Sequence, residues 1–193
     1  MIGLAASVSF LPNSFIPQEH SYDMKYRKAR PSDVEAMQRL LLTEGKNDYN
    51  YLPETEVKKH LEGIASGETE AVLAEIDGKL AGFVSYTWGK HYPQYEPPDA
   101  RNRDHGYIAE AVVSENLRGK GIGTMLLGMA RDELLKKGFS RIYLKRHAEN
   151  KASARIMEKA GFVEVETFLD PAIRTYGSRK TTVCRFAKEA NGR

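Results

Sequence analysis

The feature that most constrains the fold is a glycine-rich turn between an apolar segment and a helical one. Residues 112–138 read VVSENLRGKGIGTMLLGMARDELLKKG. Beyond the turn, apolar residues recur every fourth position from Ile122 to Leu134, which is typical of one helix face, and Gly138 marks the helix end. A second apolar segment follows at 141–145. A helical crossover joins these two strands, so they must lie parallel in one sheet.

The other segments alternate between strand-like and helix-like patterns. Ser32 as N-cap, with Glu35 three residues later, predicts a capping box that opens the first helix. Asp77-Gly78 predicts a hairpin turn. Strands are expected at 24–30, 71–76, 80–88, 107–113, 141–145, 162–168 and 181–186, with further helices at 54–66 and 151–160. This order predicts an α/β fold with a mixed sheet covered by helices.

Length and composition indicate one domain, which we place at residues 24–190 of the 193. Residues 1–23 contain no Lys or Arg, unlike a signal peptide, and are expected to be an extension, poorly ordered or draped over the surface. The net charge of +3, with no basic block, predicts no nucleic-acid partner, and no apolar run is long enough for a membrane span. One cysteine, Cys184, fits a reducing, cytoplasmic setting. The histidines show no metal-ligand spacing, so no metal is expected.

The glycine turn has the features of an anion site. It fits neither the GxGxxG nor the GxxxxGK[ST] phosphate pattern. However, a strand that enters a tight turn and then a helix directs free N–H groups and the positive end of the helix dipole at one point. Arg118 and Lys120 add positive charge. The alternative is a turn whose glycines serve shape only.

Two segments together resemble a known family. Arg118-x-x-Gly121-x-Gly123, directly after an apolar strand, is similar to the acyl-CoA motif of the GNAT superfamily of N-acyltransferases, and NKASARIMEKAGF at 150–162 resembles its second motif. The element order from residue 24 to about 187 resembles the GNAT-like fold. The resemblance implies a central mixed sheet of about seven strands flanked by about four helices.

The resemblance also implies acetyl-CoA as cosubstrate. Its pyrophosphate would lie on the amides of the glycine turn, its pantetheine arm would pair with the preceding strand, and Asn150 would contact the arm. Asn150 also fits a helix N-cap, and the two roles can coexist. The implied cofactor-binding residues are Val112, Val113, Arg118, Gly119, Lys120, Gly121, Ile122, Gly123, Thr124 and Asn150.

The implied reaction is attack of a primary amine on a thioester, which needs a base because amines are mostly protonated near neutral pH. Glu110 is the candidate, since it is the only acid in an apolar strand and burial would raise its pKa. Period-two alternation places it on one face with Ile108 and Val112. The alternative is a surface Glu; His105 and Tyr107 are weaker candidates for the base.

The general acid of the family is missing. Many members have Tyr where this chain has Met157. A thiolate is a tolerable leaving group without assistance, so water or Tyr176 would substitute. A backbone N–H near Val112 or Val113 would hold the oxyanion.

The acceptor groove implied by the resemblance is formed by the loops 45–53, 89–105 and 170–180. Candidate acceptor contacts are Tyr49, Tyr51, Tyr92 and Tyr95, with Asp48 or Glu96 attracting the amine; the alternative is that these residues only order the loops. The resulting prediction is acetyl transfer to a small-molecule amine. A peptide or protein acetyltransferase and a non-catalytic acyl-CoA sensor remain open, as does a homodimer.

Overall fold

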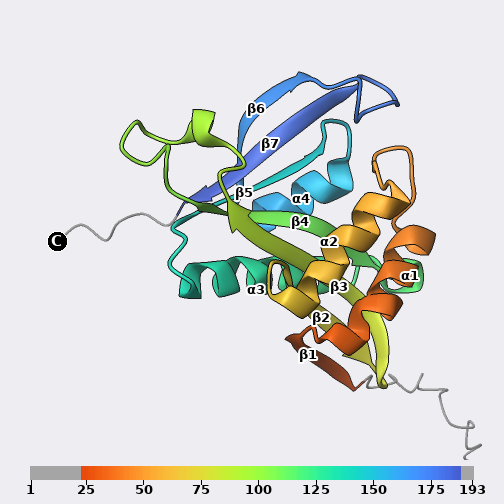
Figure 1. The fold of residues 1–193 in the computed structure, drawn as a ribbon. Helices are drawn as coiled ribbons and strands as arrows, with labels where there is room; N and C mark the ends of the chain where they lie inside the picture. The colour runs from red at the N-terminus through yellow and green to blue at the C-terminus, as the bar shows by residue number, and fades with distance from the viewer. Residues whose placement is uncertain (1–22, 188–193) are drawn as a thin grey trace, which may run out of the picture.

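The computed structural model describes residues 23–187 and contains one seven-stranded sheet with the order β1-β2-β3-β4-β5-β7-β6 (Figure 1). The strands are β1 (Met24–Lys28), β2 (Glu70–Ile76), β3 (Lys79–Gly89), β4 (His105–Val113), β5 (Arg141–His147), β6 (Val163–Leu169) and β7 (Lys180–Ala187). The α-helices are α1 (Val34–Glu44), α2 (Glu54–Ser66), α3 (Ile122–Lys136) and α4 (Lys151–Lys159). Short 3₁₀ turns lie at η1 (Pro31–Asp33), η2 (Pro93–Tyr95) and η3 (Glu115–Leu117).

Helices cover both faces of the sheet. On one face α1 and α2 pack through Met37, Leu41 and Leu61 against strand side chains that include Leu73 and Phe83. On the other face, α3 and α4 pack over the opposite side chains of the strands, and the buried residues of α3 recur at the predicted helical spacing. The expected element order and the mixed sheet with flanking helices are therefore confirmed.

The two parallel strands pair over a very short length. β4 and β5 are joined only at Gly106↔Ile142 and Tyr107↔Tyr143, whereas the other neighbours in the sheet are antiparallel and paired along most of their length. The predicted parallel arrangement is confirmed. Beyond Tyr107 the two strands separate, which opens the sheet on the side where the glycine turn begins.

A β-bulge interrupts β4 at the same place. Tyr86 pairs with Ile108 and Val84 with Ala111, so one residue on β3 faces two on β4, Ala109 and Glu110. Because of this extra residue, side chains on either side of the bulge that are an even number of residues apart point to opposite faces of the sheet. Ile108 belongs to the core under α3 and Val112 to the core under α1 and α2. The expectation that Glu110 shares one face with both residues was wrong, because alternation does not continue through a bulge.

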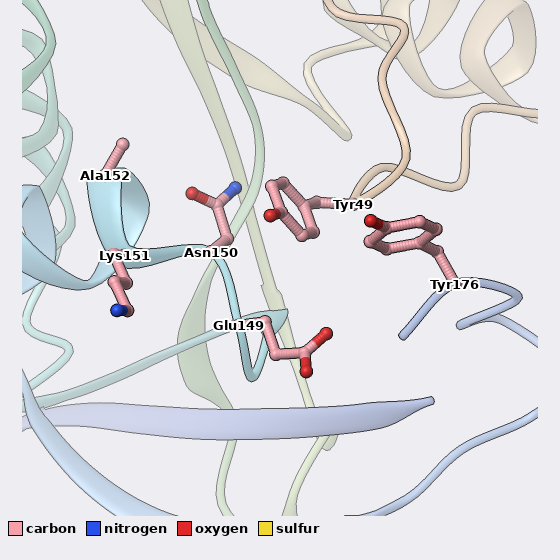
Figure 2. Close-up of a pocket in the computed structure, with 6 residues that line it drawn as sticks. All are labelled: Tyr49, Glu149, Asn150, Lys151, Ala152 and Tyr176. Carbon is pink, nitrogen blue, oxygen red and sulfur yellow. The ribbon is translucent and has the colours of Figure 1, made fainter. Parts of the chain in front are cut away.

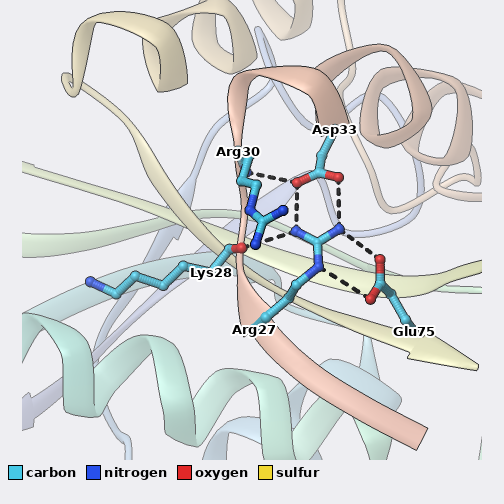
Figure 3. A network of polar contacts seen from close by, with 5 residues as sticks. All are labelled: Arg27, Lys28, Arg30, Asp33 and Glu75. Atoms are coloured by element: carbon cyan, nitrogen blue, oxygen red, sulfur yellow. Dashed lines mark hydrogen bonds and ion pairs between the residues drawn. The ribbon is translucent and has the colours of Figure 1, made fainter. Parts of the chain in front are cut away.

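The start of α1 also differs from the expected capping box. Pro31–Asp33 forms a 3₁₀ turn, and Asp33 rather than Ser32 accepts the backbone N–H of Arg30, at 2.7 Å. The Asp33 carboxylate is also held by Arg27, whose Nη1 and Nη2 donate to it at 2.7 and 2.8 Å. The same guanidinium donates to Glu75 of β2, so Arg27 ties β1, η1 and β2 together (Figure 3).

Part of the sequence-based prediction lies outside the described residues. The expected extension at 1–23 falls almost entirely in residues 1–22, and the expected domain end at 190 falls in residues 188–193. No helix within 23–187 is long and apolar enough to cross a membrane.

We predict that Arg27→Ala lowers the free energy of unfolding by about 2 kcal/mol, because two partly buried carboxylates lose their charged donor. Arg39→Ala, which removes an exposed helical pair with Glu35, should cost about 0.5 kcal/mol. Arg27 lowers the pKa of Asp33, so the difference should be full at neutral pH and shrink as the pH falls through that lowered pKa. Denaturant unfolding at several pH values measures this; equal effects of both substitutions would contradict it.

Candidate active site

The glycine turn has a backbone that only glycine adopts easily. Gly119 and Gly121 both have φ of +81°, and Gly121 is the N-cap of α3. The side chain of Ile122 is buried, so only its backbone faces the turn. A side chain at Gly123 would contact Ile156 of α4, at 3.4 Å from its added Cβ. The turn thus presents the first N–H groups of a fifteen-residue helix at an open surface, which suits an anion.

Glu44, the last residue of α1, holds this turn in place. Its carboxylate accepts the Ser114 hydroxyl at 3.0 Å and the Glu115 N–H at 2.6 Å, and its backbone carbonyl accepts Arg118 Nη2 at 2.8 Å. Arg118 therefore links the turn to α1, while half of its side chain remains exposed at the rim. Lys120 and Thr124 lie on the turn and in the first turn of α3.

The strand that leads into the turn has an open edge. Val112 and Val113 pair with Phe83 and Gly82 of β3, but the other edge of β4 has no strand partner beyond Tyr107 within the described residues. A Cβ added at Gly82 would lie only 2.7 Å from the Val112 carbonyl oxygen, so glycine permits the close pairing there. An extended arm can hydrogen-bond to this open edge.

A cleft of about 570 Å³ lies at the N-terminus of α4 and is lined by Tyr49, Glu149, Asn150, Lys151, Ala152 and Tyr176. Figure 2 shows Tyr49 between Asn150 and Tyr176. The Asn150 Oδ1 accepts the Ser153 N–H at 3.0 Å, so the residue is an N-cap, and its side-chain N–H₂ remains available to a ligand. His147 packs against Tyr49, with ring centroids 5.1 Å apart.

Glu110 lies in the bulge of β4. Its N–H donates to the Ser85 hydroxyl at 3.2 Å, and the same hydroxyl lies 2.9 Å from His60 Nε2. Burial raises the pKa of Glu110 to about 7, and the charges of Lys145 and Arg174 offset part of this rise. A carboxyl with such a pKa can gain and lose a proton near neutrality.

The loop 89–105 folds around a buried polar network rather than lining the site along its whole length. Glu96 accepts Tyr143 Oη at 2.9 Å and Arg141 Nη1 at 3.0 Å, so the expectation that it attracts an amine was wrong. His105 Nε2 accepts the Tyr92 N–H at 3.0 Å, which anchors the loop. Burial lowers the pKa of His105.

The four candidate tyrosines take different positions. Tyr49 lines the cleft, and Tyr92 lies near Tyr107, with ring centroids 5.9 Å apart, beside the strand that carries Glu110. The Tyr95 hydroxyl donates to Glu166 of β6, and Tyr51 is 47% exposed. Of the four, Tyr49 alone lines the cleft at the N-terminus of α4, whereas Tyr51, Tyr92 and Tyr95 do not.

Met157 faces the sheet. It packs against the core under α3 and α4, and the Ser153 hydroxyl donates to its sulfur at 3.8 Å. It also lines a second cleft, of about 390 Å³, together with Arg146 and the buried Cys184. Within residues 23–187, no group of three or more His, Cys, Asp or Glu side chains is placed to hold a metal ion.

The open edge, the glycine turn and the N-cap asparagine meet at one end of the sheet. Residues 34–162, more than half of the chain, match the acetyltransferase (GNAT) family. The chain belongs to this family. The match confirms the resemblance carried by the two sequence motifs.

Individual proteins that are similar to this chain agree with the family assignment. A mycothiol acetyltransferase of Cellulomonas flavigena is 34% identical over 92 residues, which are 47% of this chain and 26% of that protein, so the chain spans about a quarter of the length of that relative. A GNAT acetyltransferase from Streptococcus pneumoniae has a TM-score of 0.67 at 21% identity, covering 86% of this chain and 100% of that one.

Two further structures are similar in fold. YncA from Salmonella typhimurium, solved with its cofactor acetyl-CoA, has a TM-score of 0.69 at 17% identity, covering 89% and 97% of the two chains. A ribosomal-protein-alanine N-acetyltransferase from Brucella melitensis has a TM-score of 0.66 at 20% identity, covering 85% and 99%. At these identities the likeness shows the shared GNAT fold.

Sequence reasoning missed several residues near the candidate site. Glu44 ends a helix and carries no motif, Lys145 follows an apolar run, and Arg174 lies in the loop between β6 and β7. His147 belongs to no metal-ligand pattern and shows no other signal in the sequence. Lys145 and Arg174 stand out only after folding, when both lie near Glu110.

We predict that Gly121→Ala weakens CoA binding roughly tenfold, because a Cβ at positive φ costs about 1–2 kcal/mol and the turn would relax away from this conformation. Gly128→Ala is the matched control: it lies inside α3, its added Cβ meets nothing within 4 Å, and it should leave CoA affinity unchanged. Calorimetric titration with CoA measures both. Equal affinities of the two variants would show that the conformation of the turn does not matter for binding.

Proposed function

We propose that this chain transfers an acetyl group from acetyl-CoA to a primary amine of a small molecule, by direct attack on the thioester. The observation that carries the proposal is Glu110, a carboxyl with a pKa of about 7 in the part of β4 that is no longer paired with β5. The family match and the glycine turn support acetyl-CoA as the cosubstrate.

The residues fit the cosubstrate in three places. The N–H groups from Gly119 to Thr124 face the position of the pyrophosphate, and Arg118 lies at its rim. The free edge of Val112 and Val113 suits the pantetheine amides, and the side-chain N–H₂ of Asn150 suits a carbonyl of the same arm.

The chemical steps then follow from the positions of these groups. Glu110, directly or through a water, takes a proton from the ammonium form of the acceptor. The amine lone pair attacks the thioester carbonyl, which forms the C–N bond, and a backbone N–H of Val112 or Val113 stabilises the oxyanion. The C–S bond then breaks, and the thiolate takes the second amine proton through water. Met157 cannot donate a proton, and Tyr176, at 48% exposure, lies at the cleft mouth where it can order that water.

Peptide or protein acetylation is the second candidate. The exposure of Tyr176 favours it, because the cleft opens to solvent on that side. The loop 89–105 is anchored through the Tyr92 N–H and His105, and an ordered loop beside β4 favours the small amine. A non-catalytic acyl-CoA sensor would need no carboxyl with a raised pKa, so Glu110 argues against it.

We predict that Glu110→Gln lowers kcat by about 10²- to 10⁴-fold, because the amide cannot accept the proton, while CoA affinity stays unchanged. In the unmodified protein, kcat/KM should fall as the pH drops below about 7, where Glu110 becomes protonated. Thiol release from acetyl-CoA across an amine panel measures both. Glu62→Gln, on an exposed face of α2, is the control. A fully active Glu110→Gln variant would remove this residue from the mechanism.

We predict that Met157→Tyr leaves turnover unchanged or raises it, because it restores the proton donor that many members of the family carry at this position. Met157→Leu conserves the packing without adding a donor and should behave like the parent protein. Steady-state rates, with CoA affinity as a check of folding, distinguish the two. A large loss of turnover in Met157→Tyr with unchanged CoA binding would show that the thiolate leaves elsewhere.

A further inference from the structure

Arg174 is a buried cation of the β6–β7 loop. The residue is 6% exposed. Its Nε donates to the Thr181 hydroxyl at 2.9 Å, and its Nη1 donates to the Tyr49 carbonyl at 2.8 Å. Both acceptors are neutral. The guanidinium is therefore held in one orientation, between β7 and the loop that follows α1.

No carboxylate neutralises this guanidinium at short range. Among residues 23–187, no acid forms an ion pair with Arg174. Asp170 interacts with it electrostatically, but the Asp170 carboxylate accepts the Thr181 hydroxyl at 2.7 Å instead. Buried arginines are almost always paired, because an isolated buried charge loses its hydration without compensation. A bound anion would supply the missing partner.

The charges around Arg174 show which site that anion would occupy. Arg174 interacts electrostatically with Tyr92, Tyr107 and Glu110, all on the side of the proposed acceptor site. Lys145 of β5 adds a second cation that interacts with both Glu110 and Arg174. Lys145 makes no side-chain hydrogen bond or short ion pair within the described chain, and its residue is exposed.

We propose that the acceptor amine also carries a carboxylate, which Arg174 binds with the help of Lys145 while the amine lies at Glu110. This inference rests on the proposed function and names its substrate class: amino-acid-like compounds with a primary amine and a carboxylate. The planar guanidinium fork matches a carboxylate in geometry and in charge. The transfer itself is unchanged: the new C–N bond forms at the amine, and the carboxylate takes no part in it.

The competing explanation is purely structural, since Arg174 also fastens the Tyr49 loop. The two roles differ in what they do to selectivity. A structural role would affect all acceptors alike, whereas a carboxylate seat would affect only acceptors that carry the carboxylate.

The test compares amino acids with their carboxamides as acceptors, in thiol-release assays with acetyl-CoA. The unmodified protein should prefer the carboxylate form by roughly 10²-fold in kcat/KM, since a buried charge left unpaired is strongly penalised. Arg174→Gln should reduce this preference to less than about threefold, and its effect on the pKa of Glu110 acts on both acceptor forms and cancels in their ratio. Arg179→Gln, an exposed arginine of the same loop, is the matched control and should keep the preference.

Two further variants test the proposal if the Arg174→Gln variant does not fold. Arg174→Lys keeps the charge without the fork and should retain part of the preference, and Lys145→Gln should reduce it without touching the loop anchor. Equal losses for both acceptor forms in Arg174→Gln, or a parent protein that prefers carboxamides, would overturn the proposal.

Failure of the proposed function gives a different result. If no acceptor releases thiol, calorimetric titration of the CoA-bound protein still compares amino acids with their carboxamides. If only the carboxylate form binds, and Arg174→Gln abolishes that binding, Arg174 is supported as a carboxylate-binding residue even though no acetyl transfer occurs. Equal binding of both forms, or no binding of either, would rule out carboxylate binding by Arg174.

Discussion

The site depends on two parallel strands that hydrogen-bond at only two positions and then separate. Because β4 and β5 part after Tyr107 and Tyr143, one edge of β4 remains open in the middle of a sheet rather than at its margin. Antiparallel partners on the outer sides, β3 and β7, keep both strands in place. The helix crossover then places the glycine turn at the end of the open edge. The proposed pyrophosphate site, the proposed site of the pantetheine arm and the proposed base Glu110 thus all follow from this one interruption in the pairing of β4 with β5.

The bulge adds a second constraint at the same location. It is pinned by the Ser85 hydroxyl, which accepts the Glu110 N–H and lies within hydrogen-bond distance of His60. The bulge places Glu110 where the charges of Lys145 and Arg174 act on its carboxyl. These two cations offset part of the rise that burial causes, which leaves the pKa of Glu110 at about 7.

Local patterns were sufficient for the elements and for the two motifs. Helical spacing from Ile122 to Leu134 and the Asp77-Gly78 turn are properties of neighbouring residues, and both were predicted. The phase change at Glu110 was not, because it depends on pairing with β3. Contacts such as Glu44 with Ser114, 70 residues apart, and Arg174 with Tyr49, 125 residues apart, have no local signature. Ser32 failed as a cap because it lies inside the 3₁₀ turn, where the Asp33 carboxylate accepts the Arg30 N–H and is held by Arg27.

The bulge has a consequence for how such a domain can change over evolution. The position of the proposed base Glu110 is set by main-chain geometry and the Ser85 hydroxyl, and the proposed pyrophosphate site is set by glycine torsions. The proposed acceptor contacts, in contrast, come from loop residues such as Tyr49, Tyr92 and Arg174. Substitutions or insertions in these loops can replace one acceptor with another without displacing the proton acceptor or the cosubstrate. In the proposed site, the reaction and the choice of acceptor therefore depend on different parts of the structure.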